Sequence, residues 1–370
     1  MAELERIPVD ESAQIDRIVK LTVDQLKQRY PGGDAVRRGV HAKDHGCVTA
    51  RFTVLDALPE HLRVGIFARP GHAYDAYIRF SNASVAIASD SQVAKDGVAT
   101  HGSRGMAVKL LGVTGVPLMA TFGPMTQDFL MVNQPVFAFS NVEDYAALSQ
   151  IMLDDRDDPQ RFFKERIRIT DGKPDVTDAM TVRTLGTGKI VRRVQSATMP
   201  PAYQAPPSSP VDNRYFSGAP FLFGDDRAMK FCASPVNPRG GDAPDVSDPD
   251  YLRKALHKRL TMPGAGDIVF EFQLQVRAAT ELSATIDTDI EDACCEWDDQ
   301  KCPFETVAMI TIPPQDFETE QQCAACERLI FTPWHGIVEH RPLGGINRLR
   351  RAVYEASAQL RLMPKEPAQL

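Results

Sequence analysis

The feature that most constrains this chain is a series of short runs in which apolar residues alternate with polar ones. Such runs fill much of residues 47–136 and return at 266–278 and 305–314. A period of two is typical of β-strands that bury one face. The sequence shows no βαβ rhythm, no glycine-rich phosphate loop and no internal repeat. Repeated short strands of this kind predict an antiparallel barrel or sandwich.

Helical pattern is confined to a few segments around these runs. Apolar residues have the spacing of a helix face at 11–30, 248–260 and 346–363. Five prolines lie between 198 and 213, and strand-like pattern resumes after them. We interpret that stretch as an irregular loop inside one domain. Strands and helices in this arrangement predict the α+β class.

The charge of the chain and the absence of long apolar segments exclude several classes of protein. The 370 residues carry a formal net charge of −7, which argues against nucleic acid as a main partner. The N-terminus is acidic and does not resemble a secretory signal. The longest uncharged run, 110–127, is interrupted by glycine and proline, so no membrane span is predicted. We expect a cytoplasmic protein.

The cysteines favour free thiols. There are seven, an odd number, in a chain without a secretory signal. Cys323 and Cys326 form a Cys-x-x-Cys motif that suits a redox pair or half of a zinc site. The other closely spaced cysteines do not supply the matching second pair; these are Cys294, Cys295 and Cys302. We favour buried thiols and keep the redox and metal roles as alternatives.

The C-terminal helix carries a tyrosine between arginines. Arg350, Tyr354 and Arg361 are spaced by four and seven residues, so they share one helix face. A guanidinium one turn before Tyr354 can reach the phenol oxygen, and a nearby positive charge favours the ionised phenol. A phenolate is a ligand for haem iron. The alternative is an ordinary basic amphipathic helix in which the tyrosine only packs.

Five segments resemble, in the same order, motifs of the haem catalase superfamily. They are RRGVHAKDHGCVTARFTV (37–54), YIRFSNAS (77–84), SRGMAVKL (103–110), QDFLMVNQPVFAFSN (127–141) and RRAVYEASAQLR (350–361). The chain is similar to a small, truncated catalase-like haem peroxidase. The resemblance implies a catalase-like antiparallel eight-stranded β-barrel with flanking α-helices. It implies a single haem-binding domain at residues 30–370, preceded by a helical arm at 1–29.

The resemblance assigns catalytic roles to three residues. His41 corresponds to the distal histidine, which moves the peroxide proton from one oxygen to the other. Ser81 would hydrogen-bond the other ring nitrogen and fix the tautomer. Asn133 would hold a peroxide oxygen through an amide that does not titrate. Val40 corresponds to a residue that narrows the approach to the iron.

The resemblance also implies haem b, with Tyr354 as the proximal iron ligand and Arg350 beside it. Three arginines have counterparts that pair with the haem propionates, a contact that suits the guanidinium fork. They are Arg38, Arg79 and Arg361. His45 is then a structural or surface residue. Glu327 follows the Cys-x-x-Cys motif where covalent c-type haem needs histidine, so haem of that type is not expected.

The sequence departs from the family in length and in the pocket. It lacks the longer N-terminal arm and the C-terminal helical domain of large catalases, so we expect no bound NADPH and a homodimer. Ala138 stands where the family commonly has a second phenylalanine, and EASAQ follows Tyr354 in place of the family's usual residues. These differences favour a partly peroxidatic enzyme.

The resulting hypothesis is a haem peroxidase/catalase that decomposes hydrogen peroxide and organic hydroperoxides through a ferryl intermediate. A small organic compound would be the reductant. One alternative is a fatty-acid hydroperoxide isomerase of the allene oxide synthase type, whose members have threonine where this chain has Val40. Others are a haem-binding sensor without turnover and a non-haem β-barrel binding domain.

Overall fold

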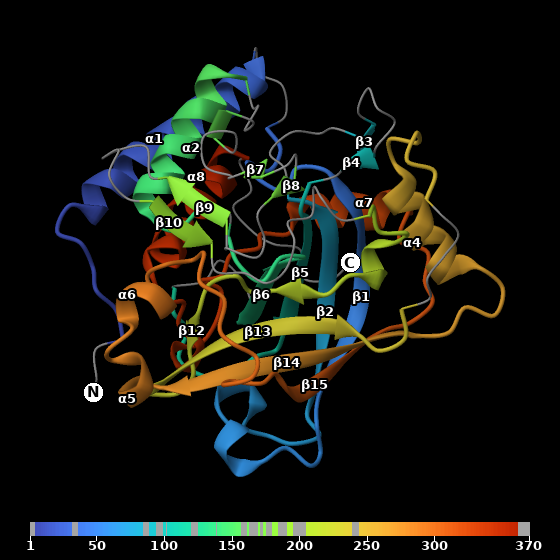
Figure 1. The fold of residues 1–370 in the computed structure, drawn as a ribbon. Helices are drawn as coiled ribbons and strands as arrows, with labels where there is room; N and C mark the ends of the chain where they lie inside the picture. Colours follow the sequence, from blue (N-terminus) through green and yellow to red (C-terminus); the bar gives the residue numbers. More distant parts are fainter. Residues whose placement is uncertain are drawn as a thin grey trace.

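Eight antiparallel strands close into a barrel (Figure 1). The computed structural model describes residues 4–31, 36–83, 89–93, 99–100, 102–119, 125–137, 139–156, 161–162, 169–170, 173–174, 180–183, 191–194, 205–238 and 244–361. The barrel strands are β1 (Asp44–Val54), β2 (Ala73–Asn82), β5 (Arg104–Leu111), β6 (Thr126–Val132), β11 (Tyr215–Phe216), β13 (Arg227–Pro235), β14 (Ile268–Ala278) and β15 (Glu305–Ile312). Their order is β11-β6-β5-β2-β1-β15-β14-β13, and β11 also pairs with β13, which closes the ring.

The other strands and the helices lie around the barrel. The remaining strands are β3 (Gln92–Val93), β4 (Ala99–Thr100), β7 (Ile169–Thr170), β8 (Lys173–Pro174), β9 (Met180–Arg183), β10 (Val191–Val194) and β12 (Phe221–Leu222). The α-helices are α1 (Glu11–Arg29), α2 (Val142–Asp154), α4 (Tyr251–Thr261), α5 (Ala279–Leu282), α6 (Ile286–Asp289), α7 (Glu320–Arg328) and α8 (Gly345–Leu360). Short 3-10 turns occur at Glu60–Leu62, Gly65–Phe67, Pro210–Asp212 and Val338–His340.

The barrel interior is the main hydrophobic core, and phenylalanines dominate it. The alternation in β14 directs Phe270, Phe272 and Leu274 inward, each fully buried. The ring centroid of Phe272 lies 5.1 Å from that of Phe52 and 4.8 Å from that of Phe129. Such aromatic contacts add to the stabilisation that apolar burial provides.

Three helices form a layer on one side of the barrel. In Figure 1, α1, α2 and α8 lie side by side, while α4 and α7 lie on the other side. Ile18, Val142 and Val353 join the three helices in one buried cluster. Asn141 caps α2 by accepting the backbone N–H of Asp144 at 3.0 Å, which satisfies a donor that the helix leaves unpaired.

The predicted α+β class and the antiparallel eight-stranded barrel are confirmed. The runs at 266–278 and 305–314 are β14 and β15, and the three helical patterns correspond to α1, α4 and α8. Of the proline-rich stretch, 198–204 lies outside the described residues, and 205–213 contains only a 3-10 turn. The division into an arm and one domain stays a prediction.

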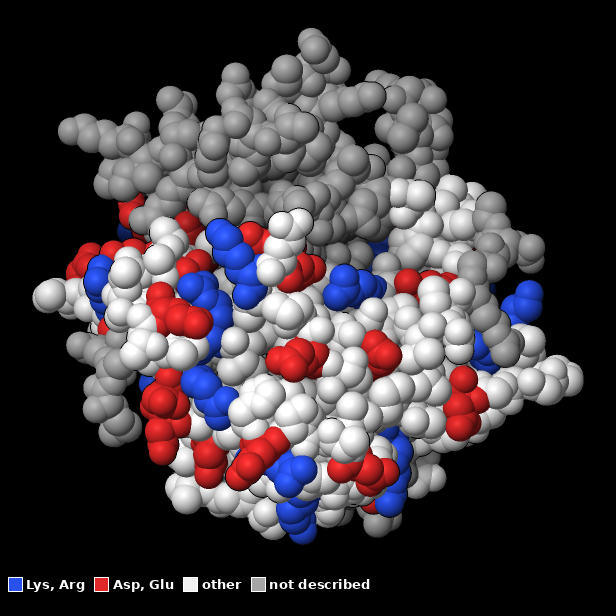
Figure 2. Space-filling model, turned by 60° about the horizontal axis from the view of Figure 1, so that its bottom comes forward, with Lys and Arg blue, Asp and Glu red and all other residues white. Residues whose placement is uncertain are grey.

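The surface mixes both signs of charge. On the face shown in Figure 2, basic and acidic side chains are interspersed. None of the described helices combines the length and the apolar character that a membrane crossing requires.

Replacing Phe272 should destabilise the barrel more than a surface change of similar chemistry. Phe272→Ala removes a ring in contact with aromatic neighbours on several strands, so we expect a loss of about 3–5 kcal/mol in the free energy of unfolding. Urea denaturation measures this loss. Val9→Ala, at a fully exposed position, should change the same free energy by less than about 0.5 kcal/mol. Equal effects of the two variants would contradict this account of the core.

Candidate active site

Residues far apart in the sequence meet at one end of the barrel. His41 precedes β1, Ser81 is near the end of β2, and Asn133 follows β6. The Nδ1 atom of His41 lies 2.9 Å from the Oγ atom of Ser81. Ser81 pairs with Gly105 of β5, and a Cβ on that glycine would lie 2.4 Å from His41 Nδ1. Only glycine therefore lets the imidazole rest against β5, a role that the sequence analysis did not assign to Gly105.

His41 has an uncommon backbone conformation and a neutral ring. Its φ of 55° lies in the left-handed region, which residues other than glycine adopt rarely. Burial, together with the positive charges of Arg79, Arg350 and Arg38, lowers the pKa of His41 to about 3. A neutral imidazole has one nitrogen that accepts a proton and one that donates, which is what proton transfer between two oxygens requires.

Asn133 is held by β5. Its Oδ1 atom accepts the backbone N–H of Arg104 at 2.7 Å, and the backbone N–H of Asn133 donates to the Arg104 carbonyl at 3.0 Å. Among the described residues, nothing accepts a hydrogen bond from the Nδ2 atom of Asn133. The buried amide is thus oriented by its oxygen and presents its N–H donors.

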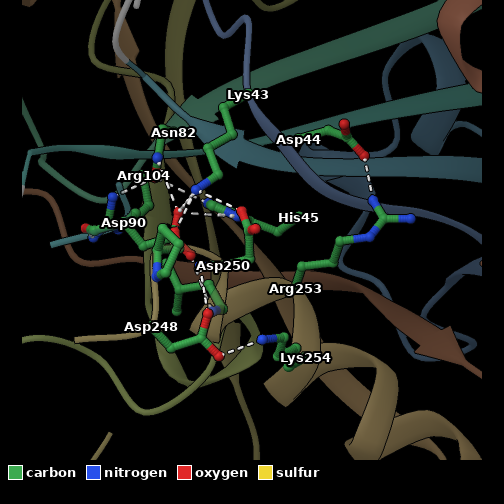
Figure 3. A network of polar contacts seen from close by, with 12 residues as sticks. Lys43, Asp44, His45, Asn82, Asp90, Arg104, Asp248, Asp250, Arg253 and Lys254 are labelled. Atoms are coloured by element: carbon green, nitrogen blue, oxygen red, sulfur yellow. Dashed lines mark hydrogen bonds and ion pairs between the residues drawn. The ribbon is translucent and has the colours of Figure 1, made fainter. Parts of the chain in front are cut away.

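A buried polar network joins Arg104, Asn82 and Asp90 (Figure 3). The Arg104 guanidinium donates to Asn82 Oδ1 and to the Asp90 carbonyl. The Asp90 carboxylate accepts from Asn82 at 3.1 Å and pairs with Lys43 at 2.9 Å. Each charged group has a partner of opposite charge or a hydrogen bond, as burial requires. Because Arg104 begins β5, the network anchors the strand whose backbone orients Asn133.

His45 belongs to this network and is a structural residue, not a surface one. Its side chain is fully buried, and its Nε2 atom lies 3.0 Å from Asn82 Oδ1. Burial lowers the pKa of His45 to about 3, with smaller contributions from Arg104 and Lys43. The neutral ring fits beside these cations without adding a further charge.

Three arginines gather beside α7. We call Arg38, Arg79 and Arg361 the arginine cluster. Arg38 donates to the Leu329 carbonyl at 2.8 Å and pairs with Glu327 at 3.0 Å. Arg361 donates to the Glu327 carbonyl.

The arginine cluster has more positive than negative charge. Burial, together with the nearby charges of Arg79 and Arg361, lowers the pKa of Arg38 to about 10. Glu327 is the carboxylate that contributes to the pKa of both Arg38 and Arg361. The Nε atom of Arg79 is buried without a hydrogen-bond partner among the described residues. Such a cluster favours binding of an anion.

Tyr354 is half-buried on α8 near other aromatic residues. The Arg350 guanidinium lies 5.5 Å from the centre of the Tyr354 ring and 5.6 Å from that of Phe137. Its hydrogen bond goes to Asn347 Oδ1 at 3.0 Å, so Arg350 lies over the ring faces rather than at the phenol oxygen. Among the described residues, Arg350 makes no hydrogen bond to that oxygen, and the role predicted for it beside the iron ligand stays a prediction. Spacing along a helix could not reveal that Asn347, three residues away, competes for the guanidinium.

Helix α8 also contacts the loop that carries the histidine. The backbone N–H of Gly39 donates to Ser357 Oγ at 3.2 Å, one turn after Tyr354. Val40, between that contact and His41, is half-buried. Ala138, the predicted difference in the pocket, lies outside the described residues.

The zinc alternative for the Cys-x-x-Cys motif has no supporting ligand set. Within the ranges that the structure describes, no three or more histidine, cysteine or acidic side chains gather as a metal site. All seven cysteines are free thiols.

Solved structures of catalases resemble this fold. A fungal catalase matches with a TM-score of 0.61 and 14% identity over 90% of this chain and 60% of its own. Catalase A from Saccharomyces cerevisiae matches with a TM-score of 0.58 and 15% identity over 89% and 62%. A bacterial catalase matches with a TM-score of 0.56 and 14% identity over 97% and 62%.

The chain therefore has a catalase-like fold, and it spans about three fifths of the length of these catalases. No family model and no curated protein matches the sequence.

The buried His45 should make stability depend on pH. The unfolded chain binds a proton at this histidine below about pH 6.5, whereas the folded protein resists protonation down to a pKa of about 3. His45 makes its full contribution to the free energy of unfolding above about pH 6.5. This contribution is lost progressively as pH falls, by about 2 kcal/mol at pH 5. We therefore measure the free energy of unfolding by urea denaturation at pH 7 and at pH 5. The difference between the two values should be smaller for His45→Gln than for the unchanged protein. His61→Gln, at an exposed histidine, is the matched control and should keep the original difference.

Proposed function

We propose that this protein is a haem-dependent peroxidase/catalase that acts on hydrogen peroxide and organic hydroperoxides. One observation carries the proposal. A neutral His41, hydrogen-bonded to Ser81, lies at the same end of a catalase-like barrel as the arginine cluster and the tyrosine of α8. General acid–base chemistry, anion binding and a metal-ligating oxygen are thus available in one region.

The residues fit haem. Haem is a flat apolar plate with two carboxylates on one edge. The arginine cluster has an excess of positive charge, and the buried Nε atom of Arg79 lacks a partner among the described residues, so carboxylates would satisfy both. Aromatic side chains lie near Tyr354, because the Arg350 guanidinium contacts the rings of both Tyr354 and Phe137. The ring centroid of Phe139 lies 5.4 Å from that of Phe137 and 4.9 Å from that of Tyr145. We infer that Tyr354 ligates the iron and that the three arginines hold the propionates.

Bound haem would supply the redox chemistry that cleaves the oxygen–oxygen bond. The chain supplies proton transfer and orientation. His41 accepts the proton of one peroxide oxygen and returns it to the other, and Ser81 fixes which ring nitrogen does so. Asn133 holds an oxygen through its N–H donors, because its Oδ1 atom is already bound to β5.

The further details of the hypothesis stay predictions. They are a small organic reductant, a homodimer, the absence of NADPH, a cytoplasmic location and one haem-binding domain that follows an N-terminal arm.

The optical spectrum of protein expressed with ample haem tests the proposal. We expect a Soret band with high-spin ferric features, altered or lost in Tyr354→Phe because the phenolate ligand is gone. Tyr74→Phe is the matched control, since Tyr74 lies at the opposite end of β2 and donates to the Ile66 carbonyl. A chain without a Soret band, or a band that Tyr354→Phe leaves unchanged, would contradict the proposal.

Turnover tests the histidine separately. With peroxide added, oxygen release measures catalase activity, and oxidation of an organic dye measures peroxidase activity. His41→Ala should lower the faster of the two by about 10²–10⁴-fold while the Soret band persists, because the general base is lost and the haem is retained. Unchanged turnover in this variant would exclude His41 as the base.

A further inference from the structure

We propose that Cys47 and Cys326 form a peroxide-sensitive thiol pair that closes to a disulfide beside the arginine cluster. The inference goes beyond the proposed function and needs no haem. It assigns a redox role to one cysteine of the Cys-x-x-Cys motif, with a partner outside that motif.

The two thiols come from different elements that pack together. Cys47 lies on β1 and Cys326 in the last turn of α7, and both belong to one buried cluster with Tyr77 and Leu329. The two thiols are close enough for each to shift the pKa of the other. Cys47 is 4% exposed and Cys326 is 3% exposed, so each is shielded from bulk reductants while adjoining the other.

The partner that the motif suggests lies elsewhere. The sulfur of Cys323 is 3.6 Å from the Arg253 guanidinium and 3.6 Å from the Phe317 carbonyl. Within the motif, Cys326 thus adjoins Cys47 of β1, while Cys323 is engaged with residues before α7.

Positive charge prepares Cys326 as the nucleophile. The ladder of β1 and β2 places Cys47 directly opposite Arg79. Arg38 donates to the Cys326 carbonyl at 2.9 Å. The hydrogen bond from Cys47 lowers the pKa of Cys326, and the charges of Arg79 and Arg38 lower it further. Burial and the same hydrogen bond raise the pKa of Cys47, which therefore stays a thiol and the donor.

The reaction with hydrogen peroxide balances in two steps. The Cys326 thiolate attacks one peroxide oxygen, an S–O bond forms, the O–O bond breaks, and water leaves after taking up a proton. This step leaves a sulfenic acid. The Cys47 sulfur then attacks the Cys326 sulfur, an S–S bond forms and the S–O bond breaks. The proton of the Cys47 thiol passes to the departing hydroxide, which leaves as a second water. Two thiols are oxidised and one peroxide is reduced.

Peptide mapping of the full-length protein tests the pair. The protein is treated with hydrogen peroxide and then unfolded in urea so that the remaining thiols, including buried ones, are alkylated. The digest is analysed by mass spectrometry with and without dithiothreitol. We expect a peptide that links Cys47 to Cys326, the loss of two alkylated thiols, and the return of both thiols on reduction. Cys323→Ser is the matched control on the same helix and should keep this link. Cys47→Ser and Cys326→Ser should abolish it.

Two outcomes would overturn the proposal, and neither depends on a variant that folds. One is a link between Cys323 and Cys326 in the unchanged protein. The other is full alkylation of Cys47 and Cys326 after peroxide treatment. Repeating the treatment on Tyr354→Phe separates the two proposals, because the disulfide should form there even if the haem spectrum is lost.

Discussion

The alternation of side chains along β2 is the constraint on which the rest of the site depends. Phe80 points into the barrel and is fully buried in its core, so its neighbours Arg79 and Ser81 must point outward. The antiparallel registers then set Ser81 opposite Gly105 and Arg79 opposite Cys47. A slip of one residue would turn Arg79 and Ser81 into the core. Burial of one phenylalanine ring thus positions both a partner of the histidine and a member of the arginine cluster.

The buried network behind Asn133 shows how the fold tolerates charges in this region. Asp90, Lys43 and Arg104 are almost completely shielded from water, and each would cost several kcal/mol alone. Together they satisfy one another, and Asp90 also accepts the backbone N–H of Leu252 at 3.1 Å. Such a network contributes little net stability, but it allows few alternative arrangements of the side chains that take part in it. It therefore favours one orientation of the strand that holds the Asn133 amide.

Much of the fold could be predicted from the sequence, because period-two alternation and helical spacing are local signals. The strands between residues 47 and 136, the strands β14 and β15, the helices α1, α4 and α8 and the α+β class followed from them, whereas β13 and α2 did not. The two-residue strand β11 could not be predicted, although its pairing with both β6 and β13 closes the ring. In a segment this short, long-range pairing decides the structure and local pattern carries almost no information.

The site was predictable to a different extent. Motif resemblance selected His41, Ser81 and Asn133, and the structure places them at one end of the barrel. The geometry between elements was not predictable. It includes the strand register that sets Cys47 opposite Arg79, the packing of α7 on β1, and the hydrogen bond of Arg350 to Asn347. These depend on how distant segments meet, which no spacing along the chain encodes.

The arginine cluster links the two proposals through electrostatics. Its charge stabilises any nearby anion, whether a carboxylate of a bound cofactor or the thiolate of Cys326. Carboxylates held by Arg38 and Arg79 would partly cancel the field that favours the thiolate. Haem binding and thiol oxidation should then oppose each other, because a negative charge at one site weakens the stabilisation available at the other. If both proposals hold, the chain without haem is the form in which the Cys326 thiolate reacts most readily with peroxide.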